Sequence, residues 1–161
     1  MLQIFMGALS LGLLWAVMTI GVYITYRILN IADLTVEGSI AVGAAIAAHA
    51  ISSGINPYVA TVLALLGGMA AGLVTGLLHT QLKIPALLSG ILTMIALYSV
   101  NLRIMGKANV SLLKMDTVYT AFENLGLSRN NAVMVLGLIC VIAVISILYW
   151  FFGTEIGCAI R

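Results

Sequence analysis

Long stretches without a charged residue constrain this chain more than any other feature. Four of them occur, at residues 1–26, 38–82, 84–102 and 130–154. A helix that crosses the hydrocarbon core of a bilayer needs about 20 consecutive apolar residues. Only 7% of the 161 residues are charged and 63% are hydrophobic, whereas about 25% of the residues in a soluble domain are charged. Lipid is therefore the expected solvent for most of the chain, and a net charge of +2 gives no indication of nucleic-acid binding.

The second stretch is too long for one crossing and is interrupted by SSGINP at residues 52–57. Asn56 followed by Pro57 is typical of a helix N-cap with proline at the first helical position. We therefore predict an all-α, polytopic membrane protein with about five transmembrane helices in a single domain, residues 1–161. The expected spans are residues 4–26, 36–51, 57–82, 85–103 and 131–152.

Small residues recur at four-residue steps in two of these spans. In lipid, helices associate through close packing of small residues, because no hydrophobic force acts between them. Packing inside the helix bundle is the expected role, with a dimer face as the alternative. The six residues predicted to pack helices together are Ser39, Gly43, Ala47, Gly68, Gly72 and Gly76.

The stretch LNIADLTVEGS, residues 29–39, places Asp33 and Glu37 between two apolar spans. A carboxylate at the centre of a spanning helix costs about 2.5–3.5 kcal/mol on insertion scales. One interpretation is a short loop in water, where charge costs nothing. The other is a loop that dips into the bundle and faces protein or a water-filled cavity, where polar groups at membrane depth are tolerated. The residues alone leave both interpretations open.

Two longer stretches carry a resemblance to a known family. YRILNIADLTVEGSIAVGAAIAA and GGMAAGLVTGLLHTQLKIPALLSGILTMIALYSVNLRIMG resemble the membrane-spanning permease subunits of bacterial ABC importers. The similarity is to the branched-chain amino acid and ribose type, in a subgroup associated with amino acids including tryptophan and tyrosine. It implies a translocation path for a small solute, an amino acid, delivered by a binding protein. We expect four residues near the inner end of this path: Asn30, Asp33, Thr35 and Glu37.

The end of the chain, FFGTEIGCAIR, resembles the family segment that leaves the membrane and begins the cytoplasmic coupling helix, on which the ATPase subunit docks. We expect Gly153 to adopt a positive φ there, as residues after helix ends often do. The resemblance also implies an N-terminal portion of a longer permease, which would not transport by itself. The residues expected to couple to the ATPase are Gly153, Thr154, Glu155, Ile156, Gly157 and Arg161.

The family topology implies a multi-pass protein of the bacterial cell (inner) membrane with its N-terminus outside. Residues 106–129 would form an extracytoplasmic loop, in which TAFE at residues 120–123 has the spacing of a capping box. The partners implied are an ATPase subunit, an extracytoplasmic solute-binding protein, the lipid bilayer and a second permease subunit in a homodimer. A solvated connection with no partner is the alternative for the loop.

No motif predicts an enzyme, a cofactor or a metal site. The segment GKAN at residues 106–109 lacks the glycine spacing and the hydroxyl residue of a phosphate-binding loop. His49 and His79 lie on separate spans, where hydrogen-bonded packing is a better interpretation than metal binding. Cys140 and Cys158 show neither metal-ligand nor disulfide spacing, so we expect them only to pack.

Two other functions fit the same residues. An ion-coupled secondary transporter or channel fragment would use Asp33 and Glu37 as a proton or cation site. An assembly or scaffold protein would use its small-residue faces only to bind other helices. Dependence of uptake on ATP rather than on an ion gradient separates the importer from the ion-coupled alternative.

Overall fold

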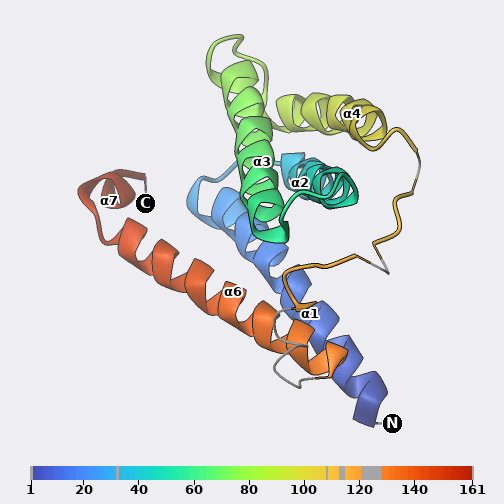
Figure 1. The fold of residues 1–161 in the computed structure, drawn as a ribbon. Helices are drawn as coiled ribbons and strands as arrows, with labels where there is room; N and C mark the ends of the chain where they lie inside the picture. Colours follow the sequence, from blue (N-terminus) through green and yellow to red (C-terminus); the bar gives the residue numbers. More distant parts are fainter. Residues whose placement is uncertain (1, 32, 108, 113–114, 121–127, 161) are drawn as a thin grey trace. The chain divides into compact units, whose positions relative to one another are not determined.

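The computed structural model describes the chain except for residues 1, 32, 108, 113–114, 121–127 and 161. The described elements are helices throughout (Figure 1): α1 (Leu2–Tyr23), the π-helix η1 (Ile24–Ile28), α2 (Thr35–Ser52), α3 (Pro57–Thr80), α4 (Ala86–Met105), α6 (Arg129–Phe152) and α7 (Glu155–Ile160). Five helices in the described part are long and apolar enough to cross a membrane. The predicted all-α, polytopic class is confirmed. Most of the predicted TAFE helix start lies outside the described residues.

The expected break between the second and third spans is present at Asn56. The Asn56 side chain accepts a hydrogen bond from the backbone N–H of Tyr58 at 3.0 Å, and Pro57 is the first residue of α3. An N-cap oxygen of this kind satisfies a backbone donor that the helix itself leaves unpaired. The local chemistry therefore starts α3 at the position that the sequence predicts.

The chain divides into two compact units. Unit 1 comprises residues 1–30 and 119–161, and unit 2 comprises residues 31–118. Unit 1 thus contains α1, η1, α6 and α7, and unit 2 contains α2, α3 and α4.

In unit 2, α2 packs against both α3 and α4 through glycines. A methyl group at Gly38 would lie 3.2 Å from the Cα of Met94 on α4, and one at Gly43 would lie 3.4 Å from the Ala64 carbonyl oxygen on α3. Gly67 on α3 is covered by the side chain of Ile46. The absence of side chains at these points lets the helix backbones approach closely, as is usual for helix pairs in membranes.

The small-residue stripe predicted on α3 only partly coincides with its contact face. Gly68 is half-buried near the Ser39 carbonyl oxygen, but Gly72 and Gly76 are exposed, and a methyl group at either would meet nothing within 4 Å. The buried positions on α3 are instead Ala60, Ala71 and Thr75. One residue along a helix is a rotation of about 100°, so the contact face lies one position away from the stripe. A packing role for Gly72 and Gly76 stays a prediction for contacts beyond the described part of unit 2.

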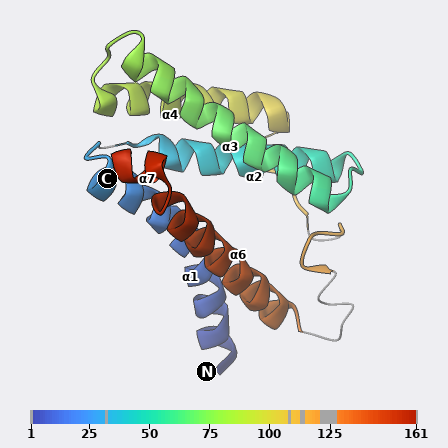
Figure 2. The ribbon, with the colours of Figure 1, turned by 90° about the vertical axis from the view of Figure 1, so that its left-hand side faces the viewer.

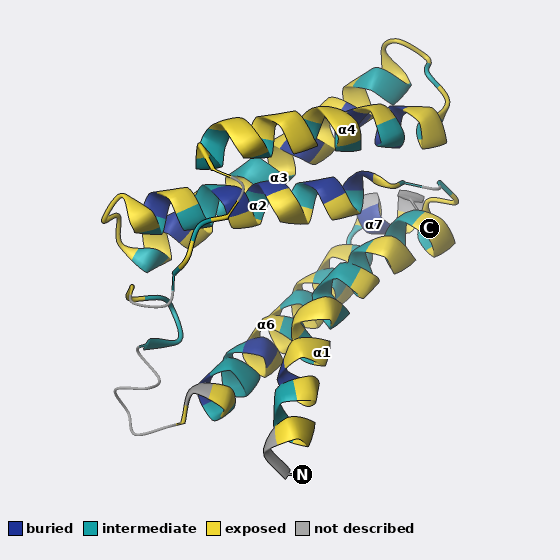
Figure 3. Cartoon of the chain, turned by 90° about the vertical axis from the view of Figure 1, so that its right-hand side faces the viewer, coloured by how far each residue is buried: buried dark blue, intermediate teal, exposed yellow. Residues whose placement is uncertain are grey.

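On α2, the predicted packing residues Ser39, Gly43 and Ala47 are all half-buried. Small and hydroxyl residues also fill the interior of unit 2, where Ser89 is fully buried and Thr93 is 3% exposed. The Thr93 hydroxyl donates to the Ser89 carbonyl oxygen at 2.9 Å, so the buried group is satisfied within its own helix. Figure 3 shows buried residues where α2, α3 and α4 meet and exposed residues on their outer faces. Large apolar side chains therefore point outward, as expected for a chain whose solvent is lipid.

In unit 1, α1 and α6 lie side by side and run in the same direction (Figure 2). The Ser10 hydroxyl lies 3.3 Å from the Asn130 carbonyl oxygen and 2.9 Å from the Met6 carbonyl oxygen, both of which accept from it. A methyl group at Gly137 would lie 3.2 Å from the Cβ of Leu13. The two helices thus contact each other through their N-terminal halves.

The close approach at Gly38 gives a direct test of glycine packing. Gly38→Leu should lower the free energy of unfolding by about 1–3 kcal/mol, because the new side chain would push α2 away from the α4 backbone. Gly72→Leu is the matched control and should change it by less than about 0.5 kcal/mol, as exposed substitutions usually do. Thermal unfolding of the purified protein in detergent measures both. An equal loss in the two variants would contradict the packing described for unit 2.

Candidate functional site: a groove between α2 and α4

The first turn of α2 is held by the Asp33 carboxylate. Its Oδ1 accepts a hydrogen bond from the backbone N–H of Thr35 at 2.8 Å. Aspartate favours this turn because its short side chain reaches the backbone two residues further on. The half-buried Asp33 therefore provides an acceptor for an N–H at the start of the helix.

The same turn contacts both neighbouring helices. A methyl group at Gly90 of α4 would lie 3.0 Å from Asp33 Oδ1 and 3.0 Å from the Leu34 backbone nitrogen. The hydroxyls of Thr35 and Thr75 lie 2.8 Å apart, and the Thr75 hydroxyl donates to the Ala71 carbonyl oxygen at 3.3 Å. Thr35 is 2% exposed. The start of α2 is thereby fixed on α4 by close packing and on α3 by a buried hydrogen bond.

The four residues expected along the translocation path have different surroundings. Asp33 and Thr35 are engaged in the turn and its packing. Glu37 is exposed and lines a cavity of unit 2. Asn30 is exposed, has a φ of 51° and belongs to unit 1; asparagine is among the residues that tolerate this left-handed conformation. The structure thus brings Asp33 and Thr35 together at a packed junction, and a path role for all four stays a prediction.

Glu37 is one of the residues that line a groove along α2 and α4. Two cavities, of about 370 Å³ and 380 Å³, share Ala41, Tyr98 and Asn101 as lining residues. We call these two neighbouring cavities together the α2–α4 groove. Its lining comprises Glu37, Gly38, Ala41, Ala44, Ala45 and Ala48 from α2, Met94, Ile95, Tyr98, Asn101, Leu102 and Met105 from α4, and Asn109 and Val110 beyond α4.

The spacing of these residues explains the groove. Positions three and four apart share a face of a helix. On α2 this face consists of Glu37 followed by alanines at positions 41, 44 and 48, whose short side chains leave space in front of the helix. On α4, Tyr98 and Asn101 are three residues apart and face the same space. The groove therefore has a carboxylate toward one end and an apolar wall beyond it.

Asn101 is a polar group that the sequence interpretation missed. Its Oδ1 is buried and has no hydrogen-bond partner in the described part of the chain. A buried acceptor without a donor costs free energy, and such atoms often mark function. The available signal was an amide inside the otherwise apolar span 85–103, since polar groups at membrane depth usually face protein or a cavity. Tyr98 was missed as well, because tyrosine in an apolar helix is too common to single out.

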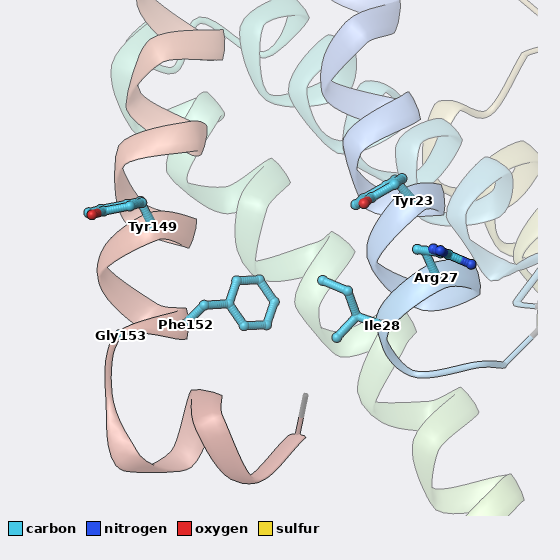
Figure 4. Close-up of a pocket in the computed structure, with 6 residues that line it drawn as sticks. All are labelled: Tyr23, Arg27, Ile28, Tyr149, Phe152 and Gly153. Carbon is cyan, nitrogen blue, oxygen red and sulfur yellow. The ribbon is translucent and has the colours of Figure 1, made fainter.

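A third cavity, of about 690 Å³, lies within unit 1. Figure 4 shows its lining residues, in which Phe152 and Ile28 face the space between the ends of α6 and η1. Tyr23, Arg27, Tyr149 and Gly153 complete the lining. Tyrosine and arginine at helix ends are typical of a membrane–water interface.

The corner between α6 and α7 is formed by Thr154. Its hydroxyl donates to the Phe151 carbonyl oxygen at 2.6 Å and accepts from the backbone N–H of Gly157 at 3.3 Å, so it caps α7. The positive φ expected at Gly153 is wrong: its φ is −83°. The position that requires glycine is the buried Gly157, where a methyl group would collide with the Phe151 carbonyl oxygen.

The other residues expected to couple to the ATPase lie around this corner. Glu155 is exposed in the first turn of α7, and Ile156 follows it in the same helix. Arg161 lies outside the described residues. A helix start with Glu155 in its first turn is favoured by the helix dipole. The structure therefore provides a short capped helix after α6, and its contact with an ATPase stays a prediction.

No group of three or more histidine, cysteine, aspartate or glutamate residues in the described part of the chain is placed to hold a metal ion. The Nδ1–H of His79 donates to the Ile84 carbonyl oxygen at 2.8 Å, as expected for a hydrogen-bonded packing residue. His49 is exposed. Cys140 and Cys158 are free and exposed, and the Cys158 thiol lies 3.7 Å from the Phe152 carbonyl oxygen.

Comparisons with known proteins identify a family for the chain. The family model described as branched-chain amino acid transport system / permease component matches residues 4–161. The tyrosine transport system permease protein of Clostridioides difficile (strain R20291) is 49% identical over 113 residues, which cover 70% of this chain and 38% of that protein. Uncharacterized protein RP368 of Rickettsia prowazekii (strain Madrid E) is 37% identical over 122 residues, which cover 76% of this chain and 43% of that protein.

The matches therefore span less than half the length of these two relatives. No solved structure matches the chain.

The role of Asp33 can be separated from its charge. Asp33→Ala should lower the free energy of unfolding by about 0.5–2 kcal/mol, because the acceptor for the Thr35 N–H is lost. Asp33→Asn keeps an oxygen acceptor without the charge and should stay within about 0.5 kcal/mol of the natural protein. Denaturant unfolding in mixed micelles compares the two. If Asp33→Asn loses as much stability as Asp33→Ala, the hydrogen bond to the Thr35 N–H is not the source of the stability and the charge itself is required.

Proposed function

Because the chain belongs to the branched-chain amino acid transport system permease family, we propose that it is the membrane-spanning permease subunit of an ATP-driven importer. It would form part of the translocation path for a small solute. The family match over residues 4–161, nearly the whole chain, is the observation that carries this proposal. The five span-length apolar helices of the described part agree with it.

We propose an amino acid as the solute. Support comes from the relative at 49% identity, which bears the name of a tyrosine transport system permease protein. The α2–α4 groove is compatible with such a solute, since its cavities of about 370 and 380 Å³ lie in the size range of small-molecule sites. Tyrosine is therefore the first substrate to test.

The α2–α4 groove supports a path that runs through unit 2. Glu37 and the alanine face of α2 would line it, while Asp33 and Thr35 would hold the start of α2 in place. Asn30 lies three residues before Asp33 in the chain and stays part of the proposed path. Polar groups of this kind in a spanning segment usually face a solute or ion pathway.

The partners follow from the proposed class. ATP hydrolysis would take place in a separate ATPase subunit, the solute would arrive on an extracytoplasmic solute-binding protein, and a second copy of the permease would complete a homodimer in the bacterial inner membrane. In this arrangement residues 153–161 lie in the cytoplasm. The capped turn of α7, with Glu155 exposed, would present the surface for the ATPase.

The ion-coupled alternative would place a proton or cation between Asp33 and Glu37. One oxygen of Asp33 already accepts a hydrogen bond from the Thr35 backbone and packs on Gly90. This favours a structural role for Asp33, and the experiment below distinguishes the two energy sources.

Uptake by membrane vesicles tests the proposal. Vesicles from cells that produce the protein with its ATPase and binding protein should take up labelled L-tyrosine only when ATP is supplied. A protonophore should leave this uptake unchanged, because no ion gradient drives it. Vesicles with an ATPase subunit that cannot hydrolyse ATP serve as the control. Uptake that persists without ATP and stops with the protonophore would favour the ion-coupled transporter instead.

A further inference from the structure

The buried amide oxygen of Asn101 lacks a hydrogen-bond donor in the part of the chain that the structure describes. Asn101 itself lines both cavities of the α2–α4 groove. Rotation about the Cβ–Cγ bond exchanges the amide oxygen and nitrogen, so the oxygen can turn toward the groove without any movement of the helix, while the NH2 group takes the buried place. A donor bound in the groove would then pair with the oxygen, and this hydrogen bond offsets the cost of burying the NH2 group. The groove can therefore present an acceptor to a hydrogen-bond donor.

Glu37 lines the same cavity as Asn101, and its side chain is exposed. Its carboxylate supplies two further acceptor oxygens and a negative charge. None of the described residues that line either cavity is a lysine, arginine or histidine. The groove thus combines acceptors and negative charge, which complement a cation and disfavour an anion.

The rest of the groove is apolar. Alanine side chains of α2 form one wall, and Met94, Ile95 and Met105 of α4 contribute to the other. The Tyr98 ring, 67% exposed, lies between the two cavities as a shared lining residue. An aromatic ring beside apolar walls can pack against an apolar or aromatic side chain of a bound solute.

We propose that the α2–α4 groove binds the transported solute by its ammonium group, through the Glu37 carboxylate and the Asn101 amide oxygen. An ammonium group has three N–H donors and no acceptor, and so matches these two residues. The apolar remainder of the solute would lie against the alanine face and Tyr98. This inference rests on the proposed function and deepens it, since it assigns recognition to the amine end of an amino acid.

The proposal distinguishes three probes of similar shape. L-tyrosine and its decarboxylated amine, tyramine, both carry an ammonium group and should bind. The des-amino acid 3-(4-hydroxyphenyl)propionate keeps the ring and carboxylate but lacks the amine, so it should bind at least about tenfold more weakly. A site that recognised the carboxylate instead would bind 3-(4-hydroxyphenyl)propionate more tightly than tyramine.

Protection of a single cysteine measures binding to the permease itself, without the selectivity of the binding protein. The exposed Cys140 and Cys158 are replaced by serine, and Ala44→Cys places one thiol in the groove. The rate of reaction with a water-soluble maleimide is then followed in the assembled transporter. L-tyrosine and tyramine should slow this reaction, whereas 3-(4-hydroxyphenyl)propionate should not. Equal protection by all three probes would overturn ammonium recognition.

Variants test the two residues individually. Glu37→Gln and Asn101→Leu should each weaken protection by tyramine about tenfold, because each removes a hydrogen bond to a charged group. Ser99→Ala is the control, because Ser99 is exposed on α4 and lies outside both cavities. In this variant tyramine should protect the cysteine as well as it does in the parent protein. Asn101→Asp keeps the shape and adds a negative charge, so tyramine should bind more tightly. Loss of tyramine protection in Asn101→Asp would contradict the proposal even if Asn101→Leu fails to fold.

The results separate this inference from the proposed function. If ATP-driven uptake is normal but no probe protects the cysteine, the ammonium site is wrong and the importer stands. The ammonium site is also wrong if the cysteine does not react with the maleimide because another helix covers the groove. If tyramine protects the cysteine but ATP drives no uptake, the groove remains an amine site and the importer assignment fails.

Discussion

The hydrogen bond from the Thr35 backbone to Asp33 sets the position of α2, on which the candidate site depends. The turn that this bond closes fits against α4 because Gly90 has no side chain, and the Thr35 hydroxyl then reaches Thr75 on α3. These contacts fix where α2 starts and how it is rotated about its axis. A shift of one residue would turn its faces by about 100° and would remove Glu37 from the groove. The polar residues of this turn therefore serve first to position α2 against α3 and α4.

Because lipid is the solvent, the helices of unit 2 contact one another through small residues and hydrogen bonds. Apolar side chains gain nothing by leaving lipid for another helix, so association relies on close packing and hydrogen bonds. In unit 2 the buried residues are glycine, alanine, serine, threonine and Val42, while the described leucines and isoleucines are half-buried or exposed. A carboxylate and an unpaired amide oxygen would be costly against lipid. Their presence in one groove therefore indicates a surface that faces protein, water or solute.

The sequence predicts the helices more accurately than the faces through which the helices contact one another. The charge-free stretches and the Asn56–Pro57 signal predicted five apolar helices and the break between the second and third. The predicted stripe on α3 coincides only partly with its contact face in unit 2: Gly68 lies against α2, as does the adjacent Gly67, whereas Gly72 and Gly76 are exposed. Spacing alone does not reveal how far along a helix a stripe of small residues is covered. Tyr98 and Asn101 were missed because their importance arises only once α4 lies against α2. The positive φ expected at Gly153 was wrong because the Thr154 hydroxyl closes the turn, a contact set by backbone geometry across the corner.

The central claim is that the alanine face of α2 borders a watery groove and not lipid. Single cysteines that replace Glu37, Ala41, Ala44 and Ala48 in turn, in the absence of the natural cysteines, test it directly in native membranes. A water-soluble maleimide should label all four positions, whereas a cysteine in place of the outward-facing Ile40, 46% exposed and outside both cavities, should remain unlabelled. Labelling at position 40 with none at the four groove positions would contradict the account.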